Sequence, residues 1–297
     1  MVAMHRLNQT VRFSWVDPAW LATPLMPIVA AFVFASCGAA ERTSGDVDPA
    51  VVHLKVRNGL YHEGHQMYLT GNFDSAQVLL GRAAGMDSSF IDPLAELGML
   101  HYDLAMAEKS DQSKTRASHL REAREYLARV EVLGTSDEAV YERLCEITVA
   151  LNDDHAFLKY ARKSAERFPF ERQYYNLGLA YFGVGDFQNV VISQKEAIVK
   201  FGQTQYLGGY YRQLGRAYMK LDRDQTAQRT FEAGLTVLDA RLHGLARDHG
   251  TGTAATKRLS DDRVAILRLL QRLYLTYHVD DKLKSVEQLL SEAGEQR

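Results

Sequence analysis

The sequence predicts an all-α protein, an α-solenoid built from about six helix–turn–helix repeats. A frame of Leu-Gly followed by an aromatic residue three positions later returns along the chain. A turn containing Gly, Asp or Asn follows that frame at a similar distance each time. Of the six prolines, only Pro93 and Pro169 follow residue 50, so the rest of the chain permits long helices.

The frame is clearest in the fourth and fifth repeats. The fourth contains Leu177-Gly178-Leu179-Ala180-Tyr181 and then the turn Gly185-Asp186-Phe187. The fifth contains Leu214-Gly215-Arg216-Ala217-Tyr218 and then Asp222-Arg223-Asp224. The first repeat, over about residues 57–90, shows the same order with Gly64 and a later Gly-Asn-Phe turn.

The spacing has a physical reason. A glycine in the first helix lets the second helix cross it closely, because a larger side chain would push the axes beyond their usual separation of about 8–10 Å. Gly tolerates the left-handed conformation that ends the first helix, and Asp or Asn caps the second. This pattern resembles the tetratricopeptide repeat, whose period is about 34 residues. The resemblance covers nearly the whole chain after residue 50 and implies a right-handed α-solenoid with one concave face.

The remaining repeats depart further from the frame. The second begins near Ile91 and is interrupted by an insertion near residues 104–116. The third is degenerate and ends at Phe168-Pro169. A second insertion, near 240–261, precedes the sixth repeat, which is marked by Leu270 and Tyr274. We expect the repeat domain to span residues 51–297.

An apolar run ends at Cys37. Residues 28–35 are all apolar, Arg6 and Arg12 precede them, and a polar stretch follows. Such a run is typical of a secretory signal and is too short for a membrane span, which needs about 20 apolar residues. Phe34-Ala35-Ser36-Cys37 resembles a bacterial lipobox. That resemblance implies a lipoprotein signal peptide over residues 1–36, a lipid (diacylglycerol, with acyl chains such as palmitate) on Cys37, and a flexible tether over residues 37–50.

Two alternatives to the lipobox stay open. An ordinary secretory signal, cleaved after Ala35, Ser36 or Ala40, fits the same residues. The other alternative is a soluble repeat protein in which the run is not a signal.

Composition and motifs argue against several classes of function. The formal net charge is −2, and it becomes −3 when Arg6, Arg12 and Asp17 leave with the signal, so nothing favours nucleic acid as a partner. Besides Cys37 the chain has only Cys145, which we interpret as a small buried apolar residue.

No catalytic arrangement is found in the sequence. His62-Glu63-Gly64-His65 has a spacing of three, whereas a zinc-protease motif needs histidines at i and i+4. Gly250-Thr251-Gly252 lacks the third glycine and the preceding strand of a dinucleotide loop. Neither a phosphate-binding loop nor a nucleophile elbow occurs. We therefore expect no enzyme activity, no cofactor and no metal.

The concave face is the expected site. In tetratricopeptide domains the inward side of each first helix carries the residues that bind a partner. The resemblance places nine such residues here: Tyr61, His65, Tyr68, Tyr102, Tyr175, Phe182, Arg212, Arg216 and Lys220. The last three recur every four residues, so they form one basic stripe on one helix face. Aromatic side chains beside a basic stripe suit an extended peptide with apolar side chains and an acidic group. The alternative is that the aromatic rings pack between helices and the stripe faces water.

These features predict a membrane-anchored scaffold or adaptor that holds another envelope protein or a peptide segment. The lipid would place it at the bacterial outer membrane, facing the periplasm, because Gly38 rather than Asp follows Cys37. In layout the chain is similar to the pilotins of type IV pilus secretins, which implies pilus or secretion-system biogenesis. The alternatives are a structural subunit of outer-membrane protein assembly, a peptidoglycan-hydrolase adaptor, and a soluble repeat protein.

Overall fold

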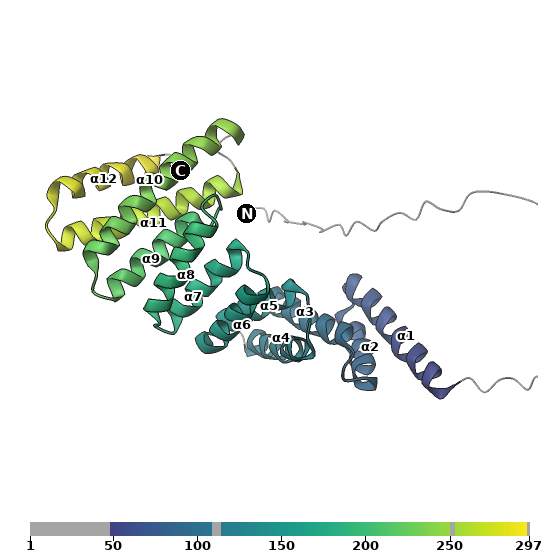
Figure 1. Cartoon of the computed structure of the whole chain (residues 1–297). Coiled ribbons are helices and arrows are strands. Elements are labelled where there is room, and N and C mark those ends of the chain that lie inside the picture. Colours follow the sequence, from purple (N-terminus) through teal and green to yellow (C-terminus); the bar gives the residue numbers. More distant parts are fainter. Residues whose placement is uncertain (1–47, 109–113, 250–252, 296–297) are drawn as a thin grey trace, which may run out of the picture. The chain divides into compact units, whose positions relative to one another are not determined.

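A computed structural model describes residues 48–108, 114–249 and 253–295 (Figure 1). These residues form twelve α-helices and no strand. The helices are α1 (Pro49–Leu69), α2 (Phe73–Met86), α3 (Ile91–Ala107), α4 (Lys114–Leu133), α5 (Glu138–Ala150), α6 (Asp154–Arg167), α7 (Glu171–Gly183), α8 (Phe187–Lys200), α9 (Leu207–Lys220), α10 (Asp224–His249), α11 (Ala254–Thr276) and α12 (Asp280–Glu295). No helix within these ranges is both long enough and apolar enough to cross a membrane.

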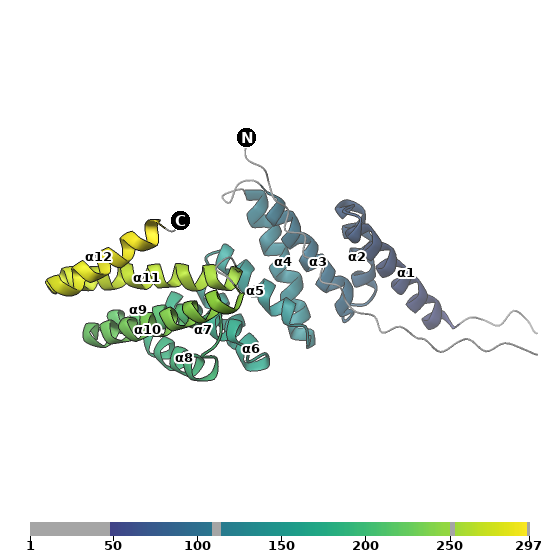
Figure 2. The ribbon, with the colours of Figure 1, turned by 90° about the horizontal axis from the view of Figure 1, so that it is seen from above.

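Consecutive helices pair as six antiparallel hairpins, from α1/α2 to α11/α12 (Figures 1 and 2). We call the first helix of each hairpin the A helix and the second the B helix. Successive hairpins pack against one another along the chain, so the predicted all-α solenoid of about six repeats is confirmed.

The turns inside the hairpins share one backbone conformation. Gly71, Asn152, Gly185, Asp222 and His278 all have positive φ, between 51° and 80°, shortly after an A helix ends. In three of these turns the next residue caps the B helix with its side chain, as Asp186 does by accepting from the backbone N–H of Asn189. The Gly-Asn and Gly-Asp signals in the sequence mark two of these turns, and Asn152, Asp222 and His278 adopt the same conformation without glycine.

The A and B helices of a hairpin cross at the predicted glycines. A Cβ atom on Gly98 would lie 2.5 Å from Leu127, and one on Gly215 would lie 2.2 Å from the ring of Phe231. The same close approach occurs between Gly64 and Leu80 in the first hairpin. Leu80, Leu127 and Phe231 are completely buried, so the space that each glycine leaves is filled by the side chain opposite.

Buried apolar residues form two large clusters and a small one. The first runs from α2 to α7, from Ala76 to Ala180, and the second runs from α9 to α12, from Leu207 to Val286. Between them lies a small cluster of two tyrosines and an alanine, Tyr174, Ala197 and Tyr210. The chain therefore has a divided core, with its boundary at the α7/α8 hairpin.

The two insertions lengthen helices. Residues 104–107 extend α3 and residues 114–116 begin α4, so these helices have 17 and 20 residues, against 14 in α2. Residues 240–249 extend α10, which reaches 26 residues, and α11 begins at Ala254.

The repeat domain begins slightly earlier than the sequence suggested. Pro49 and Ala50, placed in the tether, form the first turn of α1, because the Asp48 carboxylate accepts a hydrogen bond from the backbone N–H of Ala50 and proline fits the first helical position. The expected signal peptide, Cys37 and the tether up to residue 47 lie outside the described residues.

We expect Gly215→Ala to lower the free energy of unfolding by about 1–3 kcal/mol, because the new methyl group meets the buried ring of Phe231. Urea unfolding followed by circular dichroism measures this change. Gly81→Ala is the matched control, since Gly81 lies inside α2 and a Cβ added there would have no neighbouring atom within 4 Å. It should gain about 0.5–1 kcal/mol. Equal midpoints for the two variants would contradict the crossing described above.

Candidate binding surface

The A helices make up one layer of the structure. Contacts join α1 to α3, α3 to α5, α7 to α9 and α9 to α11, whereas within the described residues the B helices make no comparable contact with one another. The A helices of successive repeats thus lie closer together than the B helices do. In a solenoid the more closely spaced helices form the inner, concave side of the stack. We call the side chains on this side the inner layer, and the nine predicted residues all come from its helices α1, α3, α7 and α9.

Between α1 and α3, predicted residues bind carboxylates of the next repeat. The Tyr61 hydroxyl donates to Glu96 Oε1 at 3.1 Å, and His65 Nδ1 lies 2.6 Å from the same oxygen. The Tyr68 hydroxyl donates to Asp103 Oδ2 at 2.6 Å. Burial raises the pKa of Glu96, while His65 opposes that shift. These three side chains therefore join the first two repeats.

The same kind of contact continues between the next A helices. The Tyr102 hydroxyl donates to Glu146 Oε2 at 2.9 Å, and the guanidinium of Arg143 lies 4.6 Å from the centre of the Tyr102 ring. One repeat further on, Arg172 pairs with Glu142 at 2.5 Å and with Glu146 at 3.2 Å. Carboxylates from α5 thus connect α3 to α7.

Arg212 links three A helices. Its Nη2 atom lies 3.3 Å from the Tyr175 hydroxyl on α7 and 3.3 Å from Asp262 Oδ1 on α11. Burial raises the pKa of Asp262, and Arg212 is the larger of two neighbouring arginine charges that counter this. A Cβ on Gly208 would lie 2.5 Å from Asp262, and one on Gly209 would lie 2.4 Å from Tyr175, so this glycine pair allows the approach.

The rest of the basic stripe is not paired with any acid among the described residues. The guanidinium of Arg216 lies 4.4 Å from the centre of the Phe182 ring, a cation–π contact. Partial burial lowers the pKa of Arg216, and the charge of Arg212 lowers it further. Lys220 is exposed at the end of α9. The predicted stripe therefore divides into one structural arginine and two available cations.

The stripe extends into the last repeat, which the sequence pattern did not indicate. Leu270 and Tyr274 are buried in α11 as Leu214 and Tyr218 are in α9. In that alignment Arg268 and Arg272 occupy the positions of Arg212 and Arg216. Both are exposed, neither has a carboxylate partner within the described ranges, and both line a cavity of about 460 Å³ between α11 and α12.

We call Arg216, Lys220, Arg268 and Arg272 the basic end of the inner layer. These cations come from the last two A helices, α9 and α11. In the alignment of α9 with α11, Arg268 and Arg272 take the positions of Arg212 and Arg216, on the same helix face. Three other arginines of the A helices, Arg143, Arg172 and Arg212, are paired with carboxylates of the inner layer. The sequence signal that would have found Arg268 and Arg272 is the Leu-x-x-x-Tyr spacing shared by α9 and α11.

Cys145 lies on α5 and is not part of the basic end. Its side chain is buried in α5, and burial raises the pKa of the thiol to about 12. Because only the thiolate is nucleophilic, this cysteine is unreactive at neutral pH.

One further group of polar side chains, His101, His119 and Glu122, lies between α3 and α4.

The hairpins, the glycine crossings and the turns define a tetratricopeptide-repeat solenoid. No protein-family model and no curated protein matches the sequence. Among solved structures, the chain is similar to one described as the crystal structure of MamA protein, with 18% identity, a TM-score of 0.50, and coverage of 66% of this chain and 96% of that one. It is also similar to YrrB, described as a TPR protein with an unusual peptide-binding site, with 12% identity, a TM-score of 0.48, and coverage of 63% and 89%. At these identities the likeness concerns the fold.

We expect Tyr68→Phe to destabilise the protein by about 1–2 kcal/mol, because it removes a hydrogen bond to the Asp103 carboxylate that joins two repeats. Chemical unfolding measures the loss. Tyr211→Phe is the control, since the Tyr211 hydroxyl has no hydrogen-bond partner within the ranges described, and it should change stability by less than about 0.5 kcal/mol. If both variants behave alike, the tyrosine–carboxylate contacts do not hold the repeats together.

Proposed function

We propose that this protein is a scaffold that binds an acidic, extended segment of another protein at the basic end of the inner layer. The observation that carries the proposal is the difference between paired and available cations. Arg143, Arg172 and Arg212 each lie within 3.3 Å of a carboxylate oxygen. The four cations of the basic end have none among the described residues.

The basic end gathers four positive charges on one face of the inner layer, and no carboxylate among the described residues offsets them. Like charges repel one another; burial lowers the pKa of Arg216, and the charge of Arg212 lowers it further. An acidic ligand would relieve that repulsion and gain charge-assisted hydrogen bonds from the guanidinium groups. Phe182, beneath Arg216, supplies an apolar surface beside the charges. Tyr and Arg are also residue types that often dominate binding energy.

The segment is best accommodated in an extended form. Each A helix contributes a few side chains to the basic end. A peptide that runs across the helix axes would contact α9 first and then α11. The cavity lined by Val264, Leu275 and Leu290 beside Arg268 and Arg272 offers room for one apolar side chain of the ligand. This combination favours a peptide in which acidic and apolar residues alternate.

We also propose that the scaffold is a lipoprotein of the bacterial envelope, anchored at the outer membrane and facing the periplasm. The support is the apolar run before Phe34-Ala35-Ser36-Cys37 and the small residues that follow. Several acyl chains at one cysteine would make membrane release negligible, since a single chain binds only marginally. The tethered scaffold would then hold its partner in an envelope assembly, with pilus or secretion-system biogenesis as the first candidate.

Charge reversal tests the binding surface. The probe is a fluorescein-labelled peptide of about ten residues, with Glu alternating with Leu and Phe, measured by fluorescence anisotropy at low salt. We expect Arg216→Glu/Arg272→Glu to weaken its binding at least tenfold, which corresponds to about 1.4 kcal/mol. The control is Arg162→Glu/Arg229→Glu, which makes the same charge change on the B helices α6 and α10, where both arginines are exposed.

Equal weakening in the two double variants would show attraction by net charge alone and would contradict a defined site. Rising salt should weaken wild-type binding, because the charges at the basic end are exposed. A Lys-for-Glu version of the peptide should not bind.

Substitution of Cys37 tests the anchor. In a bacterial host with lipoprotein processing, Cys37→Ser should fold normally and move from the membrane fraction to the soluble periplasmic fraction, because no lipid can be attached. Fractionation with immunoblotting reads this out, and Cys145→Ser, which leaves the proposed lipid site intact, is the matched control. A Cys37→Ser protein that stays with the membrane would overturn the lipoprotein proposal while leaving the binding surface untouched.

A further inference from the structure

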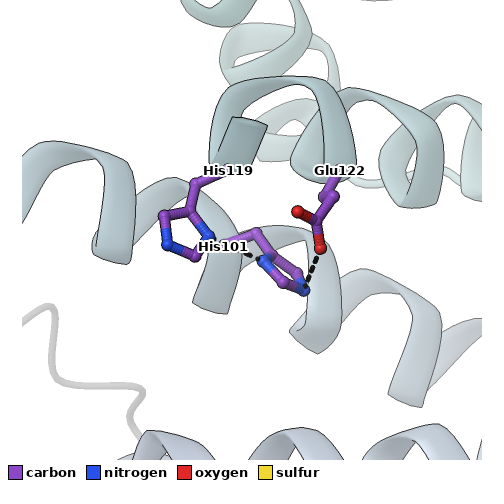
Figure 3. Close-up of side chains that lie close together, drawn as sticks. All are labelled: His101, His119 and Glu122. Atoms are coloured by element: carbon purple, nitrogen blue, oxygen red, sulfur yellow. Dashed lines mark hydrogen bonds and ion pairs between the residues drawn. The ribbon is translucent and has the colours of Figure 1, made fainter. Parts of the chain in front are cut away.

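His101, His119 and Glu122 meet between α3 and α4 (Figure 3). His101 comes from α3 and is 1% exposed, whereas His119 and Glu122 come from the second and third turns of α4 and are partly exposed. Each of the three offers one ligand atom, and these atoms all lie within 4.8 Å of one another. Within the described residues this is the one group of three His, Cys, Asp or Glu side chains with that geometry.

The imidazole rings of His101 and His119 approach each other through their Nδ1 atoms. Nδ1 of His101 lies 3.2 Å from Nδ1 of His119. On the opposite edge of the His101 ring, Nε2 lies 3.5 Å from Glu122 Oε2 (Figure 3). Nε2 is buried and has no hydrogen bond of normal length, although the carboxylate stands beside it. The ring of Tyr126 stacks on His101, with centroids 5.7 Å apart and an angle of 11°, and so holds its plane.

This geometry selects one tautomer of His101. A neutral ring carries one proton, and the carboxylate at Nε2 favours that proton on Nε2. Nδ1 then presents a lone pair toward His119, in a site where few other donors reach it.

The separation of the two nitrogens matches the needs of a metal ion. Two nitrogen ligands at about 2.0–2.1 Å from a tetrahedral ion lie about 3.3 Å apart. A carboxylate that accepts the other ring N–H of a ligating histidine is the usual outer partner in such sites, and it fixes the tautomer in the way seen here. A hydrogen bond between the two imidazoles would use the same two Nδ1 atoms, so it is the arrangement with which a metal ion would compete.

We propose that His101 and His119 bind a divalent transition-metal ion of the zinc type through their Nδ1 atoms, with Glu122 orienting His101 from the other side. Imidazole nitrogen suits Zn²⁺, Co²⁺, Ni²⁺ and Cu²⁺, whereas Mg²⁺ and Ca²⁺ prefer oxygen. Two protein ligands leave coordination positions for water or for a donor of a partner protein. The ion would join α3 to α4 in the second repeat, the hairpin that carries the first insertion.

Metal titration of the untagged full chain tests the site. The probe is Co²⁺, followed by its visible absorption and by isothermal titration calorimetry at pH 7.5, with Zn²⁺ as competitor. We expect one ion per chain, and a rise in melting temperature on adding the metal because the ion binds only the folded hairpin. His119→Ala should lose this binding, and Glu122→Gln should weaken it about 10–100-fold.

The control is His155→Ala, since His155 is exposed on α6 and belongs to no cluster, and its metal affinity should equal that of the wild type. His119 is partly exposed, so His119→Ala is expected to fold, and its circular dichroism spectrum checks this. The proposal is overturned if the wild type binds no stoichiometric Co²⁺ or Zn²⁺, or if folded His119→Ala binds them as tightly as His155→Ala. Either result leaves the peptide-binding proposal unaffected, because the two sites share no residue.

Discussion

The close crossing of the A and B helices is the constraint on which the rest of the structure depends. At Gly64, Gly98 and Gly215 the second helix lies so near that a single methyl group on the first would meet a buried side chain. In these hairpins the two helices are therefore held close together, and hairpins of similar shape stack regularly. The stacking brings successive A helices together on one side, and all the polar contacts of the inner layer follow from that approach.

The inner layer uses most of its polar groups for its own cohesion. Side chains that look like ligand-binding residues, such as Tyr68 and Tyr102, are bound to acids of the next A helix. Arg268 and Arg272 of α11 have no following A helix in the described chain that could supply carboxylates, whereas Arg216 and Lys220 of α9 stay unpaired although α11 follows. In the proposed function, an acidic partner would supply the carboxylates that these four cations lack.

The fold could be read from the sequence because its determinants are local and repeated. Gly178 and Gly215 occupy the same place in a short frame, and Gly185 with Asp186 marks a turn through backbone conformation alone. The contacts of the site were not readable in the same way. Arg212 was expected to bind a partner, yet its carboxylate, Asp262, lies beyond the second insertion, whose length hides the register. His101 and His119 are likewise separated by the first insertion, and they meet only because α3 and α4 fold back on one another.

The divided core has a consequence for the dynamics of the protein. At the boundary, Gly178 faces two buried amides, Gln194 and Gln213, whose carboxamide oxygens have no hydrogen-bond partner within the described structure. A seam of incompletely satisfied polar groups costs free energy that the flanking apolar clusters do not incur. Solenoids open in contiguous blocks, and a block ends where the coupling between neighbours is weakest. From the divided core and these buried amides, we expect the α7/α8 hairpin to be a breakpoint, at which one half of the molecule loses its order while the other keeps it.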